Sequence, residues 1–332
     1  MQTRKRVIEA AIKFETPDRL PILFDRYGRG DVHGVNWNQT GTGDTKTSES
    51  FDEWGCGWRR STVANMGQVK IHPLDDWLKL DSFNWPDPDS PSFYEGIEER
   101  FAPAGDRYVT TGIFMLLFER MQSLRGFENV MSDFYDEYEK ISALADRIAE
   151  YDIRIIENIA SRAAGRIDGF SFTDDWGSET ALLTSPALWK QFFKPRYKKI
   201  FDACRNAGWD VWMHSCGKVN DIIEDLIEIG CGVINLQQPR LLGIEEIGKK
   251  FAGRICFQTT CDIQHTLPME NDEYIENEAV LLMDSWGTER GGFILSDYGD
   301  ENAIGATPEK TRVMLDAFLR HDRWRISGDL NG

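Results

Sequence analysis

Two side chains that could bind a metal, His214 and Cys216, lie two residues apart in the segment VWMHSCG, residues 211–217. The apolar run before them predicts an extended strand, and side chains at i and i+2 of a strand leave on the same side. Imidazole nitrogen and thiolate sulfur are both good ligands for Zn²⁺, which needs at least a third protein ligand. The alternative is a hydrogen-bonded histidine beside a cysteine that packs in the core, and the H-x-C spacing leaves both interpretations open.

Polar side chains also follow four other predicted strands. They are Asp174 and Asp175, then Gln237 and Gln238, then Cys261, Asp262 and His265, and finally Ser296, Asp297, Tyr298, Asp300 and Glu301. In a barrel of parallel strands the carboxyl ends of the strands meet at one rim, so these groups would converge on one pocket. Such a convergence of polar strand ends indicates an enzyme rather than a purely structural rim.

The third metal ligand would come from another strand, and four residues are candidates: Cys261, Asp297, Glu179 and Asp175. Adjacent residues of a strand point to opposite faces, so only one of Asp174 and Asp175 is expected to enter the site. The other reading of this acidic pair is a loop with a helix-capping carboxylate. Trp176, which follows the pair, either walls the pocket or packs beneath it.

Strands and helices alternate from residue 108 to residue 321, a pattern that predicts parallel strands joined by crossover helices. The predicted strands lie at 21–25, 107–118, 168–175, 210–215, 232–237, 254–260 and 291–297, and helices are predicted at 127–165 (two helices), 185–208, 219–230, 243–253, 271–287 and 307–321. The count approaches eight βα units, which favours an α/β fold of the (β/α)8 TIM barrel type over an open doubly wound sheet. No G-x-G-x-x-G segment links a strand to a helix, which counts against a dinucleotide site.

Residues 28–105 interrupt this pattern because they are rich in Gly, Asp, Asn and Pro. They also contain five tryptophans, Trp37, Trp54, Trp58, Trp77 and Trp85, which could form a wall without regular structure. We therefore expect residues 1–332 to form a single barrel domain with an irregular N-terminal covering segment, in which 28–105 is a loop-rich insertion or cap.

Composition excludes several classes of partner. The formal net charge of −17 makes a nucleic acid an unlikely ligand, since a strongly acidic surface repels phosphates. The N-terminal segment lacks the apolar core of a signal peptide, and no apolar window is long enough to span a membrane. Six cysteines in 332 residues do not suggest a disulfide framework, so a reduced, cytoplasmic setting is expected.

Several segments resemble the uroporphyrinogen decarboxylase superfamily, and they occur in the family's order along most of the chain. They are TRKRVIEAAIKFETPDRLPI, LFERMQSLRGFENVM, FTDDWGS, SPALWKQFFKPRYKKIFDACRNAG, HSCGKV and GGFILS. The resemblance implies a (β/α)8 barrel and two classes of activity, porphyrinogen decarboxylation and corrinoid-dependent methyl transfer.

The decarboxylases of this superfamily carry a Met-Arg-Gln-Ala-Gly-Arg pattern whose arginines bind substrate carboxylates. The corresponding place here reads FDRYGRGD, so Arg26 and Arg29 are present at a different spacing. The methyltransferases look more similar, since His-x-Cys-Gly is their feature. Their thiol-specific branch adds a second Cys after the strand that matches GGFILS, whereas this chain has SDYGDENAIGATPEK there. DDWG and LFERMQSLRG look more like the branch that demethylates methyl ethers.

The expected function is a cytoplasmic methyltransferase that moves a methyl group from a small donor, such as a methyl ether, to the cobalt of a corrinoid (cobalamin). No D-x-H-x-x-G segment is present, so the corrinoid would be carried by a partner protein. The alternatives are a cofactor-free decarboxylase and a non-catalytic ligand-binding barrel. The sequence leaves the oligomeric state open, a homodimer included.

The resemblance also suggests roles for individual residues. Zinc would be held by His214 and Cys216, with Glu179 or Cys261 as a further ligand, and Asp175, His214 and Asp297 would be catalytic. Substrate binding is expected from Arg26, Phe114, Trp176, Gln237 and Tyr298.

Overall fold

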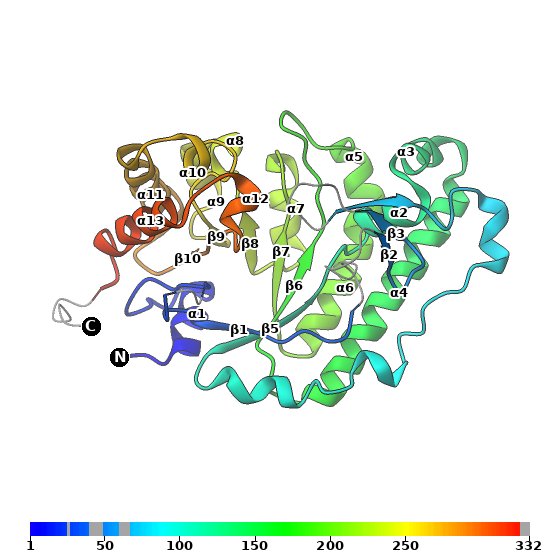
Figure 1. Cartoon of the computed structure of the whole chain (residues 1–332), viewed down its shortest axis with the longest axis horizontal. Coiled ribbons are helices and arrows are strands. Elements are labelled where there is room, and N and C mark those ends of the chain that lie inside the picture. The colour runs from blue at the N-terminus through cyan, green and yellow to red at the C-terminus, as the bar shows by residue number, and fades with distance from the viewer. Residues whose placement is uncertain (25–26, 40–48, 60–66, 326–332) are drawn as a thin grey trace.

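Parallel strands form the central curved sheet in the computed structural model, which describes residues 1–24, 27–39, 49–59 and 67–325 (Figure 1). The strand order is β1-β5-β6-β7-β8-β9-β10, and every neighbouring pair is parallel. The strands are β1 (Val32–Gly34), β5 (Tyr108–Ile113), β6 (Gly169–Thr173), β7 (Asp210–His214), β8 (Val233–Leu236), β9 (Cys256–Thr259) and β10 (Phe293–Leu295).

The two edges of this sheet are joined by the short segment around Ile22. Ile22 forms a parallel bridge with Leu295 of β10, and the Leu23 N–H donates to the Leu295 carbonyl at 2.8 Å. On the other side, the N–H of Asp31, next to β1, donates to the Ile22 carbonyl at 2.7 Å. The segment predicted as a strand at 21–25 thus closes the sheet, and the predicted (β/α)8 barrel is confirmed.

Helices cover the outside of the barrel (Figure 1). They are α1 (Arg4–Ile12), α2 (Phe118–Arg125), α3 (Phe127–Asp136), α4 (Tyr138–Ala163), α5 (Pro186–Leu188), α6 (Lys194–Asn206), α7 (Ile223–Glu228), α8 (Pro239–Leu242), α9 (Ile244–Phe251), α10 (Thr266–Met269), α11 (Asp272–Trp286), α12 (Glu301–Ile304) and α13 (Pro308–Arg320). Within the described residues, no helix combines the length and the hydropathy that crossing a bilayer requires.

The helix predicted at 185–208 is present but interrupted. Ser185 caps its start by accepting the Leu188 N–H, and Pro186 occupies the first turn as expected. A wider π-helical turn follows at Trp189–Phe193, before α6 continues to Asn206. Pro195 explains this turn, because a proline lacks the N–H that would bond one turn back.

The alternation of side chains along the strands divides the core into an inner and an outer layer. On β6, Phe170 and Phe172 point outward and pack on Trp209 and Phe201. The inward side chains near the N-terminal ends of the strands form a second apolar cluster with residues of α1, which closes that end of the barrel. The other end, where the strands finish, is left for the site.

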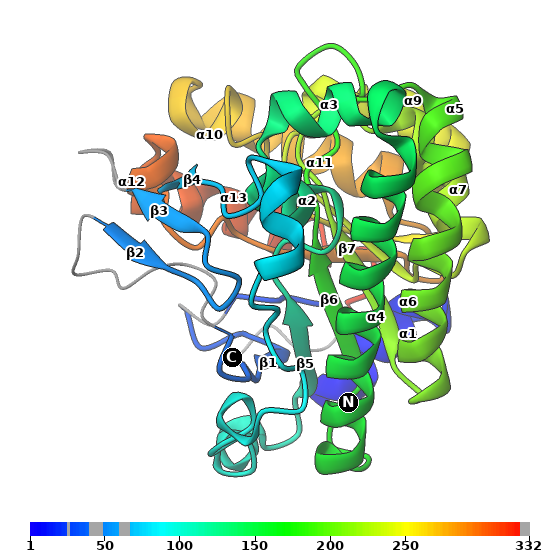
Figure 2. The same ribbon diagram turned by 90° about the vertical axis from the view of Figure 1, so that its right-hand side faces the viewer.

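The segment 28–105 contributes more regular structure than its composition predicts. It supplies the barrel strand β1 and a three-stranded antiparallel sheet of β2 (Glu49–Phe51), β3 (Gly57–Arg59) and β4 (Gln68–Ile71). In Figure 2 this small sheet stands to one side of the barrel, away from α6 and α7. One connection to the barrel is a buried ion pair between Asp52, which follows β2, and Arg120 of α2.

Candidate metal centre and its cavity

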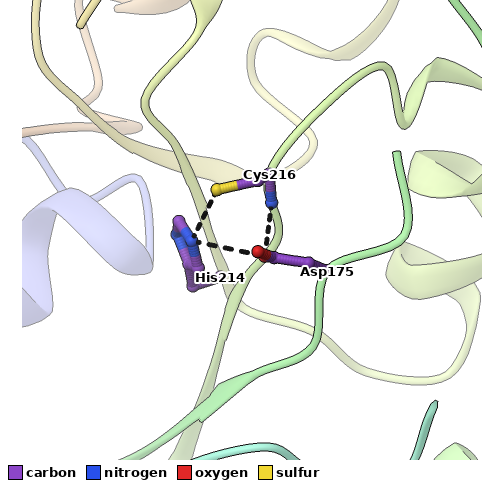
Figure 3. A group of neighbouring side chains, drawn as sticks. All are labelled: Asp175, His214 and Cys216. Atoms are coloured by element: carbon purple, nitrogen blue, oxygen red, sulfur yellow. Dashed lines mark hydrogen bonds and ion pairs between the residues drawn. The ribbon is translucent and has the colours of Figure 1, made fainter. Parts of the chain in front are cut away.

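Asp175, His214 and Cys216 point toward one another at the carboxyl ends of β6 and β7 (Figure 3). His214 Nε2 lies 3.3 Å from Cys216 Sγ and 3.6 Å from Asp175 Oδ1. One ligand atom from each residue lies within 4.8 Å of the other two, and among the described residues this is the group with metal-binding geometry. A nitrogen, a sulfur and an oxygen donor form the kind of three-ligand set that catalytic zinc sites use, with a fourth position open.

The amide of Asn235 determines which nitrogen of His214 faces this group. Asn235 pairs with His214 across β7 and β8, and its Nδ2 donates to the Gln258 carbonyl at 3.1 Å. Its Oδ1 is therefore turned toward His214 and lies 2.5 Å from Nδ1. An amide oxygen can only accept, so Nδ1 carries the proton and Nε2 presents its lone pair to Cys216 and Asp175.

Replacing Asn235 by leucine is expected to weaken metal binding by about 10- to 100-fold, because the acceptor that fixes the His214 ring is lost. Asn235→Asp keeps an oxygen acceptor for Nδ1 and loses only the donor to the Gln258 carbonyl, so as the matched control it should lose less affinity than the leucine variant. Competition for Zn²⁺ against a chromophoric chelator measures both. Equal affinities for the leucine and aspartate variants would remove Asn235 from this role.

The loops that follow β6 and β7 cross in contact, and this crossing sets the position of Asp175 relative to Cys216. The Cys216 N–H donates to Asp175 Oδ1 at 2.8 Å, and the Gly177 N–H donates to the Cys216 carbonyl at 3.1 Å. The Lys218 N–H continues the ladder to the Ser178 carbonyl at 2.8 Å. Asp175 and Cys216 are therefore held by backbone hydrogen bonds rather than by side-chain packing alone.

The surroundings of Cys216 change the pKa of its thiol group. Burial first, and then the neighbouring Asp175 carboxylate, raises the pKa of the Cys216 thiol. The sulfur thus keeps its proton at neutral pH until a cation replaces it, as thiol ligands of metals do.

Asp174 and Asp175 separate as the strand alternation predicts. Asp174 is fully buried and accepts the N–H groups of Leu117, Phe118 and Glu119 at 3.0, 2.8 and 2.7 Å. These are the first N–H groups of α2, which have no partner inside the helix. Burial raises the pKa of Asp174 to about 6. Asp174 therefore anchors α2, while Asp175 enters the site.

The α2 helix places Glu119, which the sequence reasoning missed, in the wall of the same cavity. Its Oε2 is buried and has no hydrogen-bond partner in the described structure. Burial, followed by the charges of Asp175 and Asp174, raises the pKa of Glu119 well above its usual range, which favours the protonated form of this carboxyl group. The signal in the sequence was an acid directly after the apolar run 113–118.

A cavity of about 970 Å³ opens at these residues and continues into the barrel. Its wall contains three predicted substrate-binding residues, Phe114, Gln237 and Tyr298. Its acidic groups are Glu119, Asp175 and Asp300, and no lysine or arginine lines it among the described residues. The cavity thus offers carboxyl, amide, hydroxyl and aromatic groups to a ligand.

The other predicted site residues do not join the metal-binding group or the cavity wall in the described structure. Cys261 is fully buried with its Sγ 3.6 Å from the Ile275 carbonyl, and Glu179 is exposed on the loop after β6, so neither joins the group of His214 and Cys216. Trp176 does not line the cavity, because it is fully buried and stacks on Phe118 at 4.3 Å. Asp297 is half-buried and is not part of the cavity wall. Arg26 lies outside the described residues.

Comparison with known proteins places the chain as follows. The family model for uroporphyrinogen decarboxylase (URO-D) matches residues 108–321. A solved methyltransferase from Methanosarcina mazei is 17% identical, with a TM-score of 0.66, over 97% of this chain and 99% of that chain. Xylanase 10B from Thermotoga maritima is 10% identical, with a TM-score of 0.43, over 95% of this chain and 98% of that chain. No curated protein matches the sequence. At 17% identity, the likeness to the methyltransferase shows the fold.

Proposed function

Because the chain belongs to the uroporphyrinogen decarboxylase (URO-D) family, we propose that it transfers a methyl group from a small methyl donor, such as a methyl ether, to a corrinoid on a separate protein. The observation that carries this proposal is the group of Asp175, His214 and Cys216 at the mouth of the barrel cavity. The methyltransferase from Methanosarcina mazei, whose fold covers almost the whole chain, supports methyl transfer over the family's other reaction.

The donor set fits Zn²⁺. Asn235 Oδ1 accepts from His214 Nδ1, which leaves Nε2 as the ligand atom, and Cys216 Sγ and Asp175 Oδ1 lie within ligand-forming reach of it. When bound there, zinc would supply a Lewis acid that draws electron density from the heteroatom of the methyl donor. His214, Cys216 and Asp175 would hold it, and Gln237 and Tyr298 on the cavity wall would orient the donor.

The transfer breaks the bond between the methyl carbon and the ether oxygen, and the oxygen keeps that electron pair. The corrinoid acceptor on the partner protein, in its reduced form, would supply the electron pair for the new bond to the methyl carbon. The oxygen that is left needs one proton, and Glu119, a cavity group whose pKa burial raises, would donate it. The donor would thus lie between the acidic wall and the open mouth, through which the corrinoid would reach its methyl group.

The runner-up, decarboxylation of a porphyrinogen, is less well supported by the cavity. That substrate carries eight carboxylates, and the described wall presents Glu119, Asp175 and Asp300 without a lysine or arginine. Like charges facing one another across a low-dielectric cavity oppose binding.

Zinc analysis and a methyl-transfer assay test the proposal together. The purified protein is expected to hold close to one zinc per chain and to demethylate a methoxyl donor in the presence of cob(I)alamin. Cys216→Ser should lower the zinc content, whereas Cys231→Ala, which removes a buried sulfur outside the site, should leave it unchanged. A protein without zinc and without methyl transfer to cob(I)alamin would contradict the proposal.

The free state of all six cysteines suits the cytoplasmic setting that we propose for this reaction.

A further inference from the structure

The cavity continues below the metal centre, toward the N-terminal ends of the strands. Ser171 lies two residues before Thr173 on β6, and Trp212 lies two residues before His214 on β7; both line the cavity. Two residues of a strand span roughly 6–7 Å. We call this part the lower chamber and define it by Gly34, Thr110, Ser171, Trp212 and Gln258. Gln258 marks its upper limit, because Gln258 and His214 are both in register with Asn235.

Small residues on three adjacent strands keep the lower chamber open. Interior positions of (β/α)8 barrels are normally filled by bulky side chains, but β1, β5 and β6 contribute Gly34, Thr110 and Ser171 here. A Cβ added at Gly34 would meet no atom within 4 Å, and the backbone there is not in the left-handed region. Neither packing nor backbone geometry therefore requires a glycine at this position, and its effect is to leave room.

Two neighbouring glycines, unlike Gly34, have no room for a side chain. A Cβ at Gly112 would lie 2.3 Å from the Ser171 carbonyl, and one at Gly169 would lie 2.7 Å from Tyr108 Oη. Those two glycines are needed for packing, whereas no atom of the described residues fills the space in front of the exposed Gly34.

The polar groups of the lower chamber are uncharged. Within the described residues, neither the Gln258 amide nor the Thr110 hydroxyl has a hydrogen-bond partner, so both are available to a ligand, and the Trp212 ring supplies an apolar wall. The carboxyl groups of the cavity, Asp175 among them, lie at the strand ends and in the loops above. A charged group placed in the chamber would lose its hydration, and the described residues of the chamber offer it no opposite charge.

We infer that the lower chamber binds the uncharged, ring-sized body of the substrate, which bears a hydrogen-bonding group for Gln258 or Thr110. The reactive end of that substrate then lies above it, at Asp175, His214 and Cys216. This inference depends on the proposed function for the identity of the reactive end, but the chamber itself is defined by its walls.

Three probes of one size and different charge test the chamber: benzyl alcohol, benzoate and benzylammonium. Calorimetric titration of the purified protein is expected to give an affinity for benzyl alcohol at least tenfold higher than for either charged probe. Gly34→Leu fills the open space and should weaken benzyl alcohol binding at least tenfold, while Gly34→Ala should weaken it less. Thr110→Val, which replaces a hydroxyl by a methyl group of similar size, should cause a loss of a few fold.

Two results would overturn the inference: tighter or equal binding of a charged probe, or unchanged binding of benzyl alcohol to Gly34→Leu protein that melts like the unaltered protein. If Gly34→Leu fails to fold, the Thr110→Val result and the order of the three probes decide in its place. None of these titrations uses zinc or a corrinoid, so failure of the proposed reaction and failure of the chamber are distinguishable.

Discussion

Gly177→Ala is expected to weaken zinc binding about 100-fold, the largest effect that we predict for a residue that offers no ligand atom. A Cβ at Gly177 would lie 2.3 Å from the Lys218 nitrogen and 2.7 Å from the Gly217 Cα, both backbone atoms that cannot rotate away. The two loops must therefore separate, and they carry Asp175 and Cys216. Overpacking of this kind costs about 1–3 kcal/mol, and a loss of about 2.7 kcal/mol in binding corresponds to 100-fold.

The matched control is Gly232→Ala, at the start of the neighbouring strand. There the added Cβ would find its neighbours at 3.6 Å or more, an ordinary contact, so zinc affinity should stay as in the unaltered protein. Chelator competition gives the affinities, and the absorption of Co²⁺ bound in place of zinc reports whether the sulfur is still a ligand. Unaltered affinity and spectrum in Gly177→Ala would show that the loop crossing does not position the site.

The barrel could be predicted from the sequence because its strands from residue 108 onward are buried, apolar and separated by helices. The small strand β1 could not, since Val32–Gly34 is three residues long and contains a histidine and a glycine. Its place depends on pairing with β5, which is a tertiary contact that local pattern does not contain. The same holds for the small sheet β2-β4.

The site was predictable where it follows from strand alternation and not where it depends on loops. His214 and Cys216 were expected on one side, and only one aspartate of Asp174 and Asp175 was expected to enter; the structure shows both features. Asp175 lies beside His214 and Cys216, and Cys261 does not. The position of Asp175 next to Cys216 depends on the loop crossing at Gly177, which no spacing rule describes. Glu119 was missed because its importance comes from burial.

Arg120→Met is expected to lower the free energy of unfolding by about 3–5 kcal/mol, because it leaves a buried carboxylate without its counter-charge. Arg120 Nη1 lies 2.9 Å from Asp52 Oδ2, and the side chains are 1% and 0% exposed. The guanidinium also lies over the Trp54 ring, 5.1 Å from its centre. Urea denaturation measures the loss.

Asp52 also accepts hydrogen bonds from the residues that follow it. The loss of stability in Arg120→Met should therefore be concentrated in the segment that contains the small sheet. Its Oδ1 accepts the N–H groups of Trp54 and Cys56 at 3.0 and 2.9 Å, and its Oδ2 accepts Trp58 Nε1 at 3.1 Å. In Arg120→Met these bonds must stabilise the charge alone, and limited proteolysis should cut between residues 49 and 71 before it cuts the barrel.

The double variant Arg120→Met/Asp52→Asn separates the charge from the packing. With both charges removed, no unpaired ion remains, and the unfolding free energy should recover to within about 2 kcal/mol of the unaltered protein. Arg320→Met is the surface control, since Arg320 is 53% exposed in its ion pair with Glu276 and should cost less than about 1 kcal/mol. A double variant less stable than Arg120→Met alone would show that packing and hydrogen bonds around Asp52, and not the uncompensated charge, dominate the attachment of the small sheet to the barrel.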